Sequence, residues 1–464
     1  MFTAPTICAI STPSGIGGIA VIRLSGDQAF ATSDKIFHSP VIGKKLADQQ
    51  ANTLHFGSVI KGKETLDEVV VALFRAPHSY TGEDVVEISC HGSRFIQQQI
   101  LEVLIEEGAI LAQPGEFTQR AFLNGKMDLS QAEAVADLIA SENSAAHRVA
   151  INQMRGGFSS ELGILRDQLL HFITLIELEL DFSEEDVEFA DRTQLITLSQ
   201  KIETLIGKLT DSFRLGNAIK NGIPVAIVGE TNVGKSTLLN ALLNEEKAIV
   251  SDIHGTTRDV IEDVVNLNGV LFRFFDTAGL RHTTDTIESM GIERSYRKLE
   301  LASIVLLVLD LTSPFEKNLS RIGEIRKMIT DQQLILVANK SDLATEEIRR
   351  ELSGLALKSN ESLVFIAAKA KDNLTGLITE MQSVLTSNKI SPEDVVVTNI
   401  RHYEALTKAL ESIRRTLAGL KQNISGEFLS QDIRECLHYL GSITGQITTD
   451  EVLGNIFKNF CIGK

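Results

Sequence analysis

The sequence feature that most constrains the fold is the stretch GETNVGKS, residues 229–236, which matches the pattern G-x-x-x-x-G-K-[ST]. An apolar run, residues 224–228, precedes it, and a helix-like segment, residues 237–243, follows it. In this context small residues let backbone N–H groups curl around phosphates, and the helix N-terminus adds favourable potential. We expect the Lys235 ammonium to reach the β- and γ-phosphates and the Ser236 hydroxyl to bind Mg²⁺. The stretch therefore predicts a nucleoside triphosphate site at the end of a buried strand.

Four further motifs follow in the order that is typical of GTPases. GTTRD, residues 255–259, comes next, and DTAG, residues 276–279, ends a strand-like run. NKSD, residues 339–342, ends another apolar run, and its Asp342 can accept both donors on the guanine edge, a pair that adenine lacks. AAK, residues 367–369, is expected to close the base pocket through backbone contacts. Five motifs in this order, at strand ends, predict specificity for GTP.

Several residues in these motifs have expected roles around the phosphates. Thr257 is the expected switch ligand of magnesium and the γ-phosphate, Asp276 can bind magnesium through water, and the Gly279 N–H can reach the γ-phosphate. The residues expected to bind GTP are Asn232, Val233, Gly234, Lys235, Ser236, Thr237, Ser251, Asp252, Ile253, His254, Gly255, Thr256, Thr257, Asp276, Thr277, Ala278, Gly279, Asn339, Lys340, Asp342, Ala367, Ala368 and Lys369.

The position after DTAG departs from the usual GTPase pattern. Many GTPases carry there a glutamine that orients the attacking water, but this chain has Leu280, which cannot hydrogen-bond through its side chain. Glu288 lies a few residues on and could place the water through a bridging water; the alternative is a solvated switch-region glutamate. No internal arginine finger is evident. A monovalent cation beside the phosphates, near Asn232 and residues 251–257, could neutralise developing charge instead.

Composition limits the classes of function. The 464 residues suggest about three domains. The formal net charge of −16 argues against general affinity for polyanions, so any contact with nucleic acid requires a local basic patch or a partner protein. We see no signal peptide and no apolar run long enough for a membrane span. The four cysteines show no CxxC pairing, which disfavours a structural zinc site or a disulfide scaffold, and we expect a cytoplasmic protein.

Four segments follow one another along the chain. The first alternates short β-like runs with turns and reads as an α+β domain, the second and fourth are helical, and the third alternates strands and helices. Ser130 and Glu133 form the pattern of a capping box at the start of a helix in the second segment. The expected fold class is multidomain α/β, with an N-terminal α+β domain, a discontinuous helical bundle and an inserted Ras-like P-loop GTPase domain. The predicted segments are 1–123, 124–216, 217–386 and 387–464.

Longer stretches extend these patterns into a family resemblance. The chain resembles the MnmE (TrmE) family of tRNA-uridine-modification GTPases over essentially its full length. The GTPase motifs are shared with many other families, whereas PGEFTQRAFLNGK and FCIGK are far more specific. The stretches that carry the resemblance are TPSGIGGIAVIRLSG, SYTGEDVVEISCHG, QPGEFTQRAFLNGKMDLSQAEAVADLI, GETNVGKSTLLNAL, AIVSDIHGTTRDV, FFDTAGLRHTTDTIESMGIERS and the terminal FCIGK.

The resemblance implies a folate site in residues 1–123. The family's N-terminal domain is similar to the folate-binding fold of aminomethyltransferases and binds 5-formyl- or 5,10-methylene-tetrahydrofolate. By similarity Arg23, Glu87 and Lys126 contact this folate, and the C-terminal Lys464 reaches the same site. Without the resemblance, Arg23 and Glu87 on strands would read as surface charges. Cys461 is implied to be a catalytic residue of the modification, and a buried, inert cysteine is the alternative.

The resemblance also assigns the ions of the GTPase domain. A potassium ion is implied to help two GTPase domains dimerise across their nucleotides, and Glu288 is implied to position the attacking water. The implied potassium ligands are Asn232, Ser251, Ile253 and Thr256, and the implied magnesium ligands are Ser236 and Thr257.

The function that follows is a potassium-dependent GTP hydrolase that acts in tRNA modification. With the flavoprotein MnmG (GidA), in a heterotetramer, the family uses a tetrahydrofolate one-carbon unit to add an aminomethyl or carboxymethylaminomethyl group to carbon 5 of the wobble uridine, position 34, of certain tRNAs. The family also suggests a homodimer through the folate domains and no membrane association.

Two alternatives belong to other functional classes. A regulatory GTPase switch of the ribosome-assembly type would lack one-carbon chemistry and would carry a basic RNA-binding appendage, which the acidic balance disfavours. A folate-dependent aminomethyltransferase, with the GTPase as regulator only, would retain transferase activity without MnmG. Binding of tetrahydrofolate and the requirement for MnmG distinguish the three possibilities.

Overall fold

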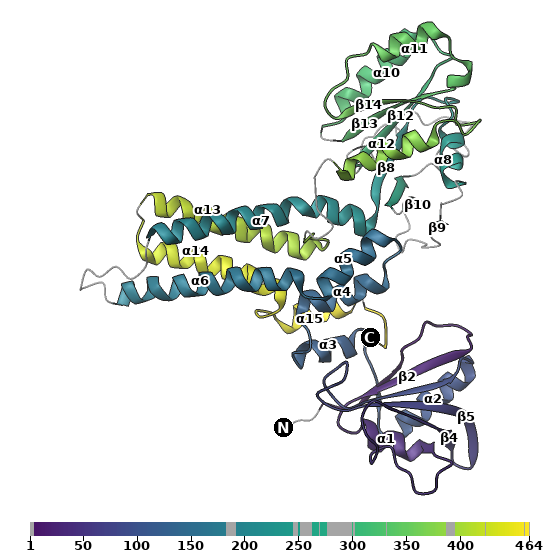
Figure 1. The fold of residues 1–464 in the computed structure, drawn as a ribbon, viewed down its shortest axis with the longest axis vertical. Coiled ribbons are helices and arrows are strands. Elements are labelled where there is room, and N and C mark those ends of the chain that lie inside the picture. The colour runs from purple at the N-terminus through teal and green to yellow at the C-terminus, as the bar shows by residue number, and fades with distance from the viewer. Residues whose placement is uncertain are drawn as a thin grey trace. The chain divides into compact units, whose positions relative to one another are not determined.

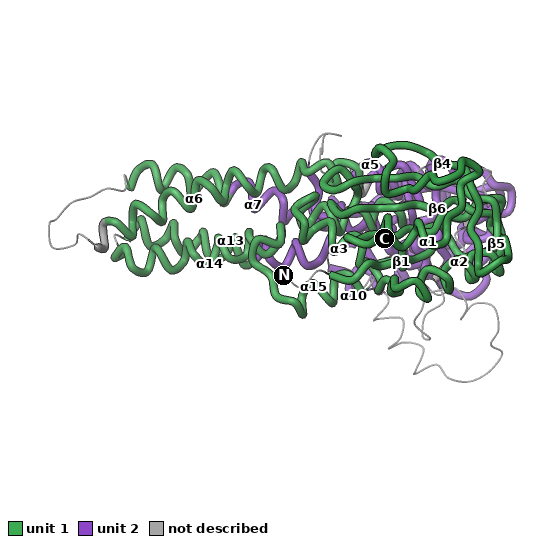
Figure 2. The backbone as a smooth tube through the Cα atoms, turned by 90° about the horizontal axis from the view of Figure 1, so that it is seen from below, with its two compact units in different colours: residues 1–140, 150–203, 408–464 green, residues 141–149, 204–407 purple. Residues whose placement is uncertain are grey.

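The structure is a computed structural model, and the described residues form two compact units (Figure 2). The first unit is Met1–Ala140, Ala150–Glu203 and Lys408–Lys464, and the second is Ser141–Val149 and Thr204–Thr407. The described residues are 4–181, 192–244, 249–250, 262–268, 270–275, 299, 302–330, 332–386, 395–422, 424–458 and 460–463.

The first unit begins with a seven-stranded sheet in the order β3-β4-β5-β6-β2-β1-β7 (Figure 1). Its pairs are antiparallel except β1 with β7, which are parallel. Because side chains alternate along a strand, one face of β2 and β6 presents a buried apolar row to α1 and α2, and the other face presents Arg23 and Glu87. The elements are β1 Ile7–Ile10, β2 Ile19–Ser25, α1 Ala29–Ile36, β3 Phe37–His38, β4 Thr53–Lys61, β5 Glu64–Phe74, β6 Val85–His91, α2 Arg94–Glu106 and β7 Ile110–Leu111.

Helices complete the first unit. The long helices α6 and α14 lie side by side (Figure 1), and an ion pair joins Arg434 Nη2 to Glu177 Oε1 at 2.5 Å. A core of Leu129, Leu453 and Phe457 joins α4 to α15. The helices here are α3 Glu116–Leu123, α4 Leu129–Ile139, α6 Gly157–Asp181, α14 Gly426–Thr444 and α15 Asp450–Phe457, with parts of α5 Ser144–Met154, α7 Arg192–Asn221 and α13 Ile400–Lys421.

The start of α4 corrects one prediction. Its N-cap is Asp128, whose side chain accepts from the Gln131 N–H while the Gln131 side chain accepts from the Asp128 N–H, so the capping box lies two residues earlier than expected. Ser130 instead lies inside the helix, buried, where its hydroxyl bonds to the Ser159 hydroxyl at 2.7 Å. Glu133 is also buried in the helix. The helix therefore uses the earlier of two overlapping cap patterns, and Ser130 packs inside the helix.

The second unit contains a seven-stranded sheet in the order β14-β13-β12-β8-β11-β10-β9. Strands β14 to β11 are parallel, and β10 and β9 join at one edge as antiparallel strands. The strands are β8 Ile223–Val228, β9 Ile249–Val250, β10 Glu262–Leu267, β11 Val270–Phe275, β12 Ile304–Asp310, β13 Gln333–Asn339 and β14 Glu361–Phe365; the helices are α8 Lys235–Leu243, α10 Phe315–Met328, α11 Glu346–Ser353 and α12 Leu374–Thr386, with the short 3₁₀ helix η3 Ser341–Leu343.

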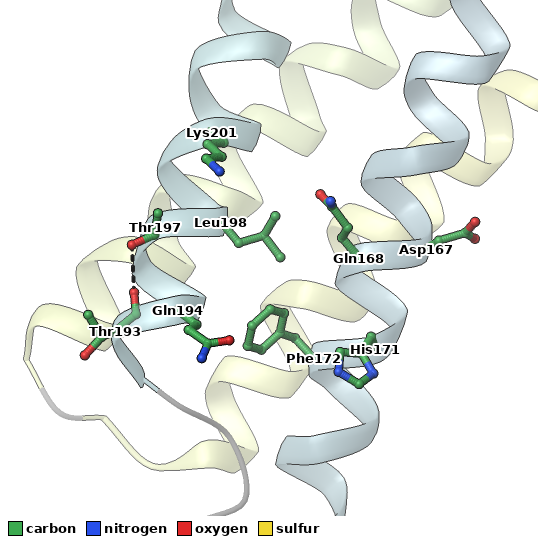
Figure 3. Close-up of a pocket in the computed structure, with 9 residues that line it drawn as sticks. All are labelled: Asp167, Gln168, His171, Phe172, Thr193, Gln194, Thr197, Leu198 and Lys201. Atoms are coloured by element: carbon green, nitrogen blue, oxygen red, sulfur yellow. Dashed lines mark hydrogen bonds between the residues drawn. The ribbon is translucent and has the colours of Figure 1, made fainter.

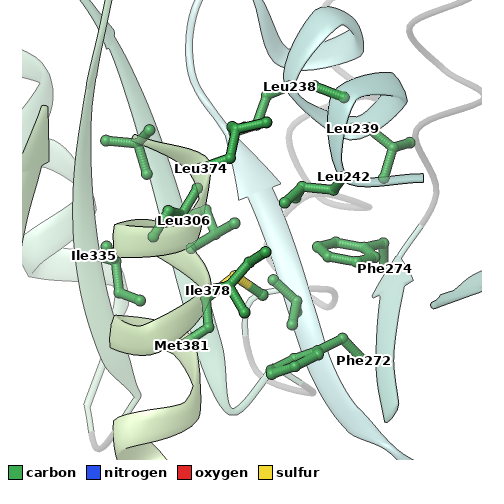
Figure 4. Packing of buried hydrophobic residues seen from close by; sticks show 14 of the residues in the cluster. Leu238, Leu239, Leu242, Phe272, Phe274, Leu306, Ile335, Leu374, Ile378 and Met381 are labelled. Carbon is green, nitrogen blue, oxygen red and sulfur yellow. The ribbon is translucent and has the colours of Figure 1, made fainter. Parts of the chain in front are cut away.

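Both faces of this sheet are covered, which explains the continuous apolar runs in its strands. On one face Leu242 of α8 and Met381 of α12 pack with Phe272 and Phe274 of β11 (Figure 4). On the other face α10 and α11 pack against the alternate residues of β12 and β13. The multidomain α/β fold class is confirmed, with a doubly wound parallel sheet whose strands end at one edge. No helix within the described ranges is both long and apolar enough to cross a membrane.

Candidate functional site

The phosphate loop joins β8 to α8 in the second unit. Lys235 is the first residue of α8, and its Nζ donates to the Gly229 carbonyl at 2.7 Å and to the Glu230 carbonyl. The ammonium therefore lies inside the curve of the loop, where it is 8 % exposed. Burial lowers the pKa of Lys235, the nearby Arg321 lowers it further, and Glu230 opposes both.

Gly234 shows how tightly the loop is built. Its φ is +103°, and a Cβ added there would lie 2.3 Å from Nδ2 of Asn339. The left-handed conformation and the missing space both require glycine. The next residues, Ser236 and Thr237, are exposed in the first turn of α8, as is Asn232 in the loop, which has φ +65°. A cradle that a Cβ would fill, followed by a hydroxyl at a helix N-terminus, fits Mg²⁺-bound nucleotide phosphates.

Asn339 ties three of the motifs together. This side chain is 2 % exposed at the end of β13; its Nδ2 donates to the Val233 carbonyl at 2.8 Å, and its Oδ1 accepts from the Ala368 N–H at 3.0 Å. The phosphate loop and the AAK stretch are thus fixed to one amide. Asp342 is exposed in η3, Ala367 is buried beside Ala368, and Lys369 is exposed. The prediction that these segments meet at one edge of the sheet agrees with this geometry.

Asp310 is a contributor that sequence reasoning missed. It ends β12, and its Oδ2 accepts from Lys340 Nζ at 2.6 Å, which holds the lysine of NKSD in place. Burial alone would raise the pKa of Asp310, but the hydrogen bonds from Lys340 and Thr312 outweigh it, so this pKa lies below its ordinary value. The available signal was its position: it follows a run of apolar residues at a strand end, as the recognised motifs do.

The switch motifs lie outside the described residues. The predicted site residues concerned are Ser251, Asp252, Ile253, His254, Gly255, Thr256, Thr257, Asp276, Thr277, Ala278, Gly279 and Glu288, together with Leu280. Of the four predicted potassium ligands, the structure describes Asn232. The assignments to potassium and to the attacking water therefore stay predictions.

The predicted folate residues of the first unit come together on adjacent strands. Arg23 of β2 and Glu87 of β6 are opposite in register, and both Nε and Nη2 of the arginine lie 2.8 Å from Glu87 Oε1. The guanidinium lies 5.3 Å from the Tyr80 ring centroid and 5.7 Å from that of Phe117, within the range of cation–π contacts. The side chains are 17 % and 26 % exposed. They form a half-buried ion pair close to two aromatic rings, a pairing that the interpretation as surface charges does not include.

Lys126 lies against the loop that carries Tyr80. Its Nζ donates to the Pro77 carbonyl at 2.9 Å, and the neighbouring Asn124 donates to the Thr81 carbonyl at 2.8 Å. The Tyr80 hydroxyl bonds in turn to that of Thr118 at 2.8 Å. The stretch PGEFTQRAFLNGK therefore binds the loop that carries Tyr80, with Lys126 bound to the start of the loop at Pro77.

Arg120 is a second residue that sequence reasoning missed. It is 7 % exposed, and its guanidinium donates to the Glu83 carboxylate at 3.1 and 3.3 Å, to Glu116 Oε1 at 2.8 Å and to the Pro5 carbonyl at 2.8 Å. Glu83 also accepts from Ser25 of β2 at 2.6 Å. This network fixes α3 to the sheet beside the Arg23–Glu87 pair.

The chain's end reaches the same pair. The Gly463 carbonyl accepts from Ser11 Oγ at 3.2 Å and from Arg23 Nη1 at 3.5 Å. Cys461 is exposed, so the alternative of a buried cysteine is wrong for this position. Lys464 lies outside the described residues.

A pocket of about 610 Å³ lies between α6 and α7 of the first unit (Figure 3). Its apolar floor is formed by Phe172 and Leu198, with polar side chains around them. None of the residues predicted for nucleotide or folate lines it. The lining residues are Asp167, Gln168, His171, Phe172, Thr193, Gln194, Thr197, Leu198 and Lys201.

Known proteins and family models match nearly the whole chain. The family model of the MnmE helical domain matches residues 129–461, and that of the GTP-binding protein TrmE N-terminus matches residues 6–126. The tRNA modification GTPase MnmE of Parabacteroides distasonis is 58 % identical over 464 residues, which are 99 % of this chain and 100 % of the relative. The protein of the same name from Bacteroides thetaiotaomicron is 56 % identical over 463 residues, 99 % of each chain. Among solved structures, the G domain of the T. maritima FeoB iron transporter aligns with 35 % of this chain and 98 % of its own, at 27 % identity and a TM-score of 0.25.

Proposed function

The chain belongs to the MnmE family of tRNA modification GTPases, and we propose that it couples GTP hydrolysis to a folate-dependent modification of the wobble uridine of tRNA. GTP hydrolysis in tRNA modification is the activity carried by the family. The observation that supports it most directly is the buried Lys235 ammonium at the start of α8, in a loop whose Gly234 leaves no room for a side chain.

Magnesium and the switch residues complete the proposed hydrolytic site. Ser236, exposed at the first turn of α8, would hold Mg²⁺ together with Thr257. The ion, when bound, neutralises charge on the β- and γ-phosphates. Glu288 would orient the attacking water, since Leu280 cannot. Replacing Glu288 by alanine is expected to keep GTP affinity and lose turnover; weakened binding with normal turnover would contradict this role.

Potassium is proposed as the substitute for an arginine finger. Its proposed ligands are Asn232, Ser251, Ile253 and Thr256. The structure supports the proposal with Asn232, an exposed amide held at φ +65° within the phosphate loop. An alkali cation there would lie beside the phosphates and stabilise charge as it develops.

Tetrahydrofolate is the proposed one-carbon donor of the first unit. The Glu87 carboxylate can accept from the donor edge of a pterin, and Arg23 can donate to a carboxylate or carbonyl of the ligand. Their mutual bond, the aromatic rings of Tyr80 and Phe117, and the tail contact at Gly463 support a built site on this face of the sheet. Lys126 and Lys464 are the remaining proposed contacts.

The proposed assembly is a homodimer that works in the cytoplasm with MnmG in a heterotetramer, with tRNA as the substrate. The sheet face that carries Arg23 also exposes apolar side chains: Ile19 on β2 is 71 % exposed, and Leu54 and Phe56 on β4 are 72 % and 57 % exposed. Grouped apolar exposure of this kind is typical of surfaces that bind protein. It supports dimerisation through the N-terminal domain.

The decisive experiment is a tRNA-modification assay with purified MnmG, tetrahydrofolate, GTP and either potassium or sodium. The proposal expects modified wobble uridine when all components and potassium are present, and a strong loss in sodium. Activity without MnmG would favour the aminomethyltransferase alternative. Calorimetry is the second experiment and measures the binding of tetrahydrofolate to the intact protein. A titration that releases no heat would favour a regulatory GTPase without one-carbon chemistry.

A further inference from the structure

The C-terminal segment, residues 460–463, contacts the N-terminal domain on both sides of Cys461. Before the cysteine, Phe457 and Phe460 pack against each other, with ring centroids 5.1 Å apart, beside Gly115. At the cysteine, the Gly115 N–H donates to the Cys461 carbonyl at 3.4 Å. After it, the Gly463 carbonyl accepts from Ser11. The segment therefore contacts the first unit before, at and after Cys461, and the contact at the cysteine is made by its main-chain carbonyl.

Two glycines make this contact possible. At Gly115, φ is +69° and an added Cβ would lie 2.8 Å from the Phe457 carbonyl oxygen and 2.9 Å from Cβ of Phe460. At Gly463, φ is +92° and an added Cβ would lie 2.3 Å from the Ile10 carbonyl oxygen. Each glycine is thus required both by its left-handed conformation and by the segment that it touches. We call Ile10, Ser11 and Gly115 the C-terminal seat.

Only one cysteine side chain is presented to solvent. Cys8, Cys90 and Cys436 are buried, and burial raises the thiol pKa to about 11 for Cys8 and Cys90 and to about 12 for Cys436. Cys461 combines a main chain that is fixed by the seat with an exposed side chain. This combination positions a thiol while leaving it free to react.

Arg23 connects the seat to the Glu87 carboxylate. The Nε and Nη2 edge of its guanidinium binds Glu87, and Nη1 on the other edge faces the Gly463 carbonyl. A guanidinium presents its donors in a rigid fork, so fixing one edge orients the other. Arg23 therefore contacts both Gly463 and Glu87, so the C-terminal segment lies next to the pair that is proposed to bind folate.

We propose that Gly463 and Ser11 are positioning residues, which hold the C-terminal segment in its seat through main-chain contacts and thereby present Cys461 beside the Arg23–Glu87 pair. The inference rests on the proposed folate-dependent function and adds two residues whose contribution is geometric. Gly463 acts through the space that it leaves and through its carbonyl, and Ser11 acts through its hydroxyl.

Amide hydrogen exchange tests the seat on the full-length protein without folate, nucleotide or tRNA. In Gly463→Ala, peptides that contain Gly115 and the C-terminal residues should exchange about tenfold faster than in wild type, because a lost contact raises the population of the open segment. Gly454→Ala is the matched control, since Gly454 is in α15 and an added Cβ there has nothing within 4 Å. Ser11→Ala should accelerate the same peptides by about threefold, and Ser11→Thr, which keeps the hydroxyl, should restore them.

Two exchange results would overturn the proposal. Wild-type exchange at both peptides in Gly463→Ala would mean that no seat exists. Equal acceleration in the distant helices α6 and α14 would make residue 463 a determinant of the stability of the whole unit instead. GTP hydrolysis measured on the same samples shows that each variant retains a folded second unit.

Modification activity gives the functional readout. Gly463→Ala and Ser11→Ala should lose tRNA modification while GTP hydrolysis stays near that of wild type, and Ser11→Thr and Gly454→Ala should retain both. Full modification by Gly463→Ala would refute the positioning role. The folate proposal is tested separately from the seat. If tetrahydrofolate binding produces no heat in calorimetry but the exchange results are as expected, the C-terminal seat is confirmed and the folate assignment is wrong.

Discussion

The two sheets of this molecule build their sites in different ways. In the second unit, polar residues gather at the carboxyl ends of parallel strands, where the side chains of Lys235 and Asn339 bond to main-chain groups of the adjoining loops. In the first unit, Arg23 and Glu87 project from the middle of antiparallel strands onto an open face. The site of the second unit is thus built around a loop at a strand end, whereas the Arg23–Glu87 pair of the first unit lies on the face of a sheet. The comparison predicts that the two sites respond independently to substitution.

The largest expected effect is on the nucleotide site. Lys235→Ala should weaken GTP binding by about 100-fold, since hydrogen bonds to charged groups contribute about 1.5–3 kcal/mol each. Titration with a fluorescent GTP analogue measures it. Lys317→Ala is the matched control. Lys317 forms an ion pair with Glu230 in which both side chains are exposed to solvent. A comparable loss in the control would mean that general positive charge, and not the loop, binds the nucleotide.

A smaller loss is expected in the first unit. Arg23→Ala should weaken tetrahydrofolate binding by about 10- to 100-fold, because it removes a charged donor and leaves Glu87 unpaired. GTP hydrolysis should remain unchanged if the sites are independent. Calorimetry and a phosphate-release assay give the two readouts, and Lys35→Ala, which removes an exposed ion pair with Glu107, is the control. A loss of hydrolysis in Arg23→Ala would show that the two sheets do not function separately.

The potassium preference should depend on one loop amide. Wild-type hydrolysis is expected to be several-fold faster in potassium than in sodium, and Asn232→Ala should bring the ratio close to one, since the amide oxygen is the proposed ligand. Asn240→Ala, exposed on α8 outside the loop, should leave the ratio unchanged. Equal rates of the wild type in the two salts would reject the ion site.

The smallest expected effect is electrostatic. The pKa of Asp310 is held below its ordinary value of 3.8, so its pairing with Lys340 stabilises the fold above that pH, and the contribution is lost as the pH falls through the lowered value. The Lys340 side chain is 31 % exposed, so Asp310→Asn should cost only about 1 kcal/mol at pH 7. Urea midpoints of the two proteins should therefore converge only when the pH falls below the lowered pKa of Asp310. A difference that persists there would mean that the carboxylate stabilises the unit by something other than its charge.

The sequence predicted the two units unequally. GETNVGKS is contiguous, and its mechanism depends on backbone and a following helix, so both the site and its strand–loop–helix context could be predicted. The roles of Asn339 as a bridge and of Asp310 as a clamp could not, because they depend on three strand ends meeting in space. Arg23 and Glu87 are far apart in the chain, and only the family resemblance brought them together before the structure did. Arg120 was missed because a buried cation on a helix has no local pattern.

The C-terminal seat has a consequence for biosynthesis. Ser11 is made long before the residue that its hydroxyl binds, because the carbonyl of Gly463 lies 452 residues later in the chain. Domains generally fold in the order of their synthesis, N-terminal first. The sheet of the first unit can therefore form during translation, whereas the contacts of Ser11 and Arg23 with Gly463 form only after that later residue has been made.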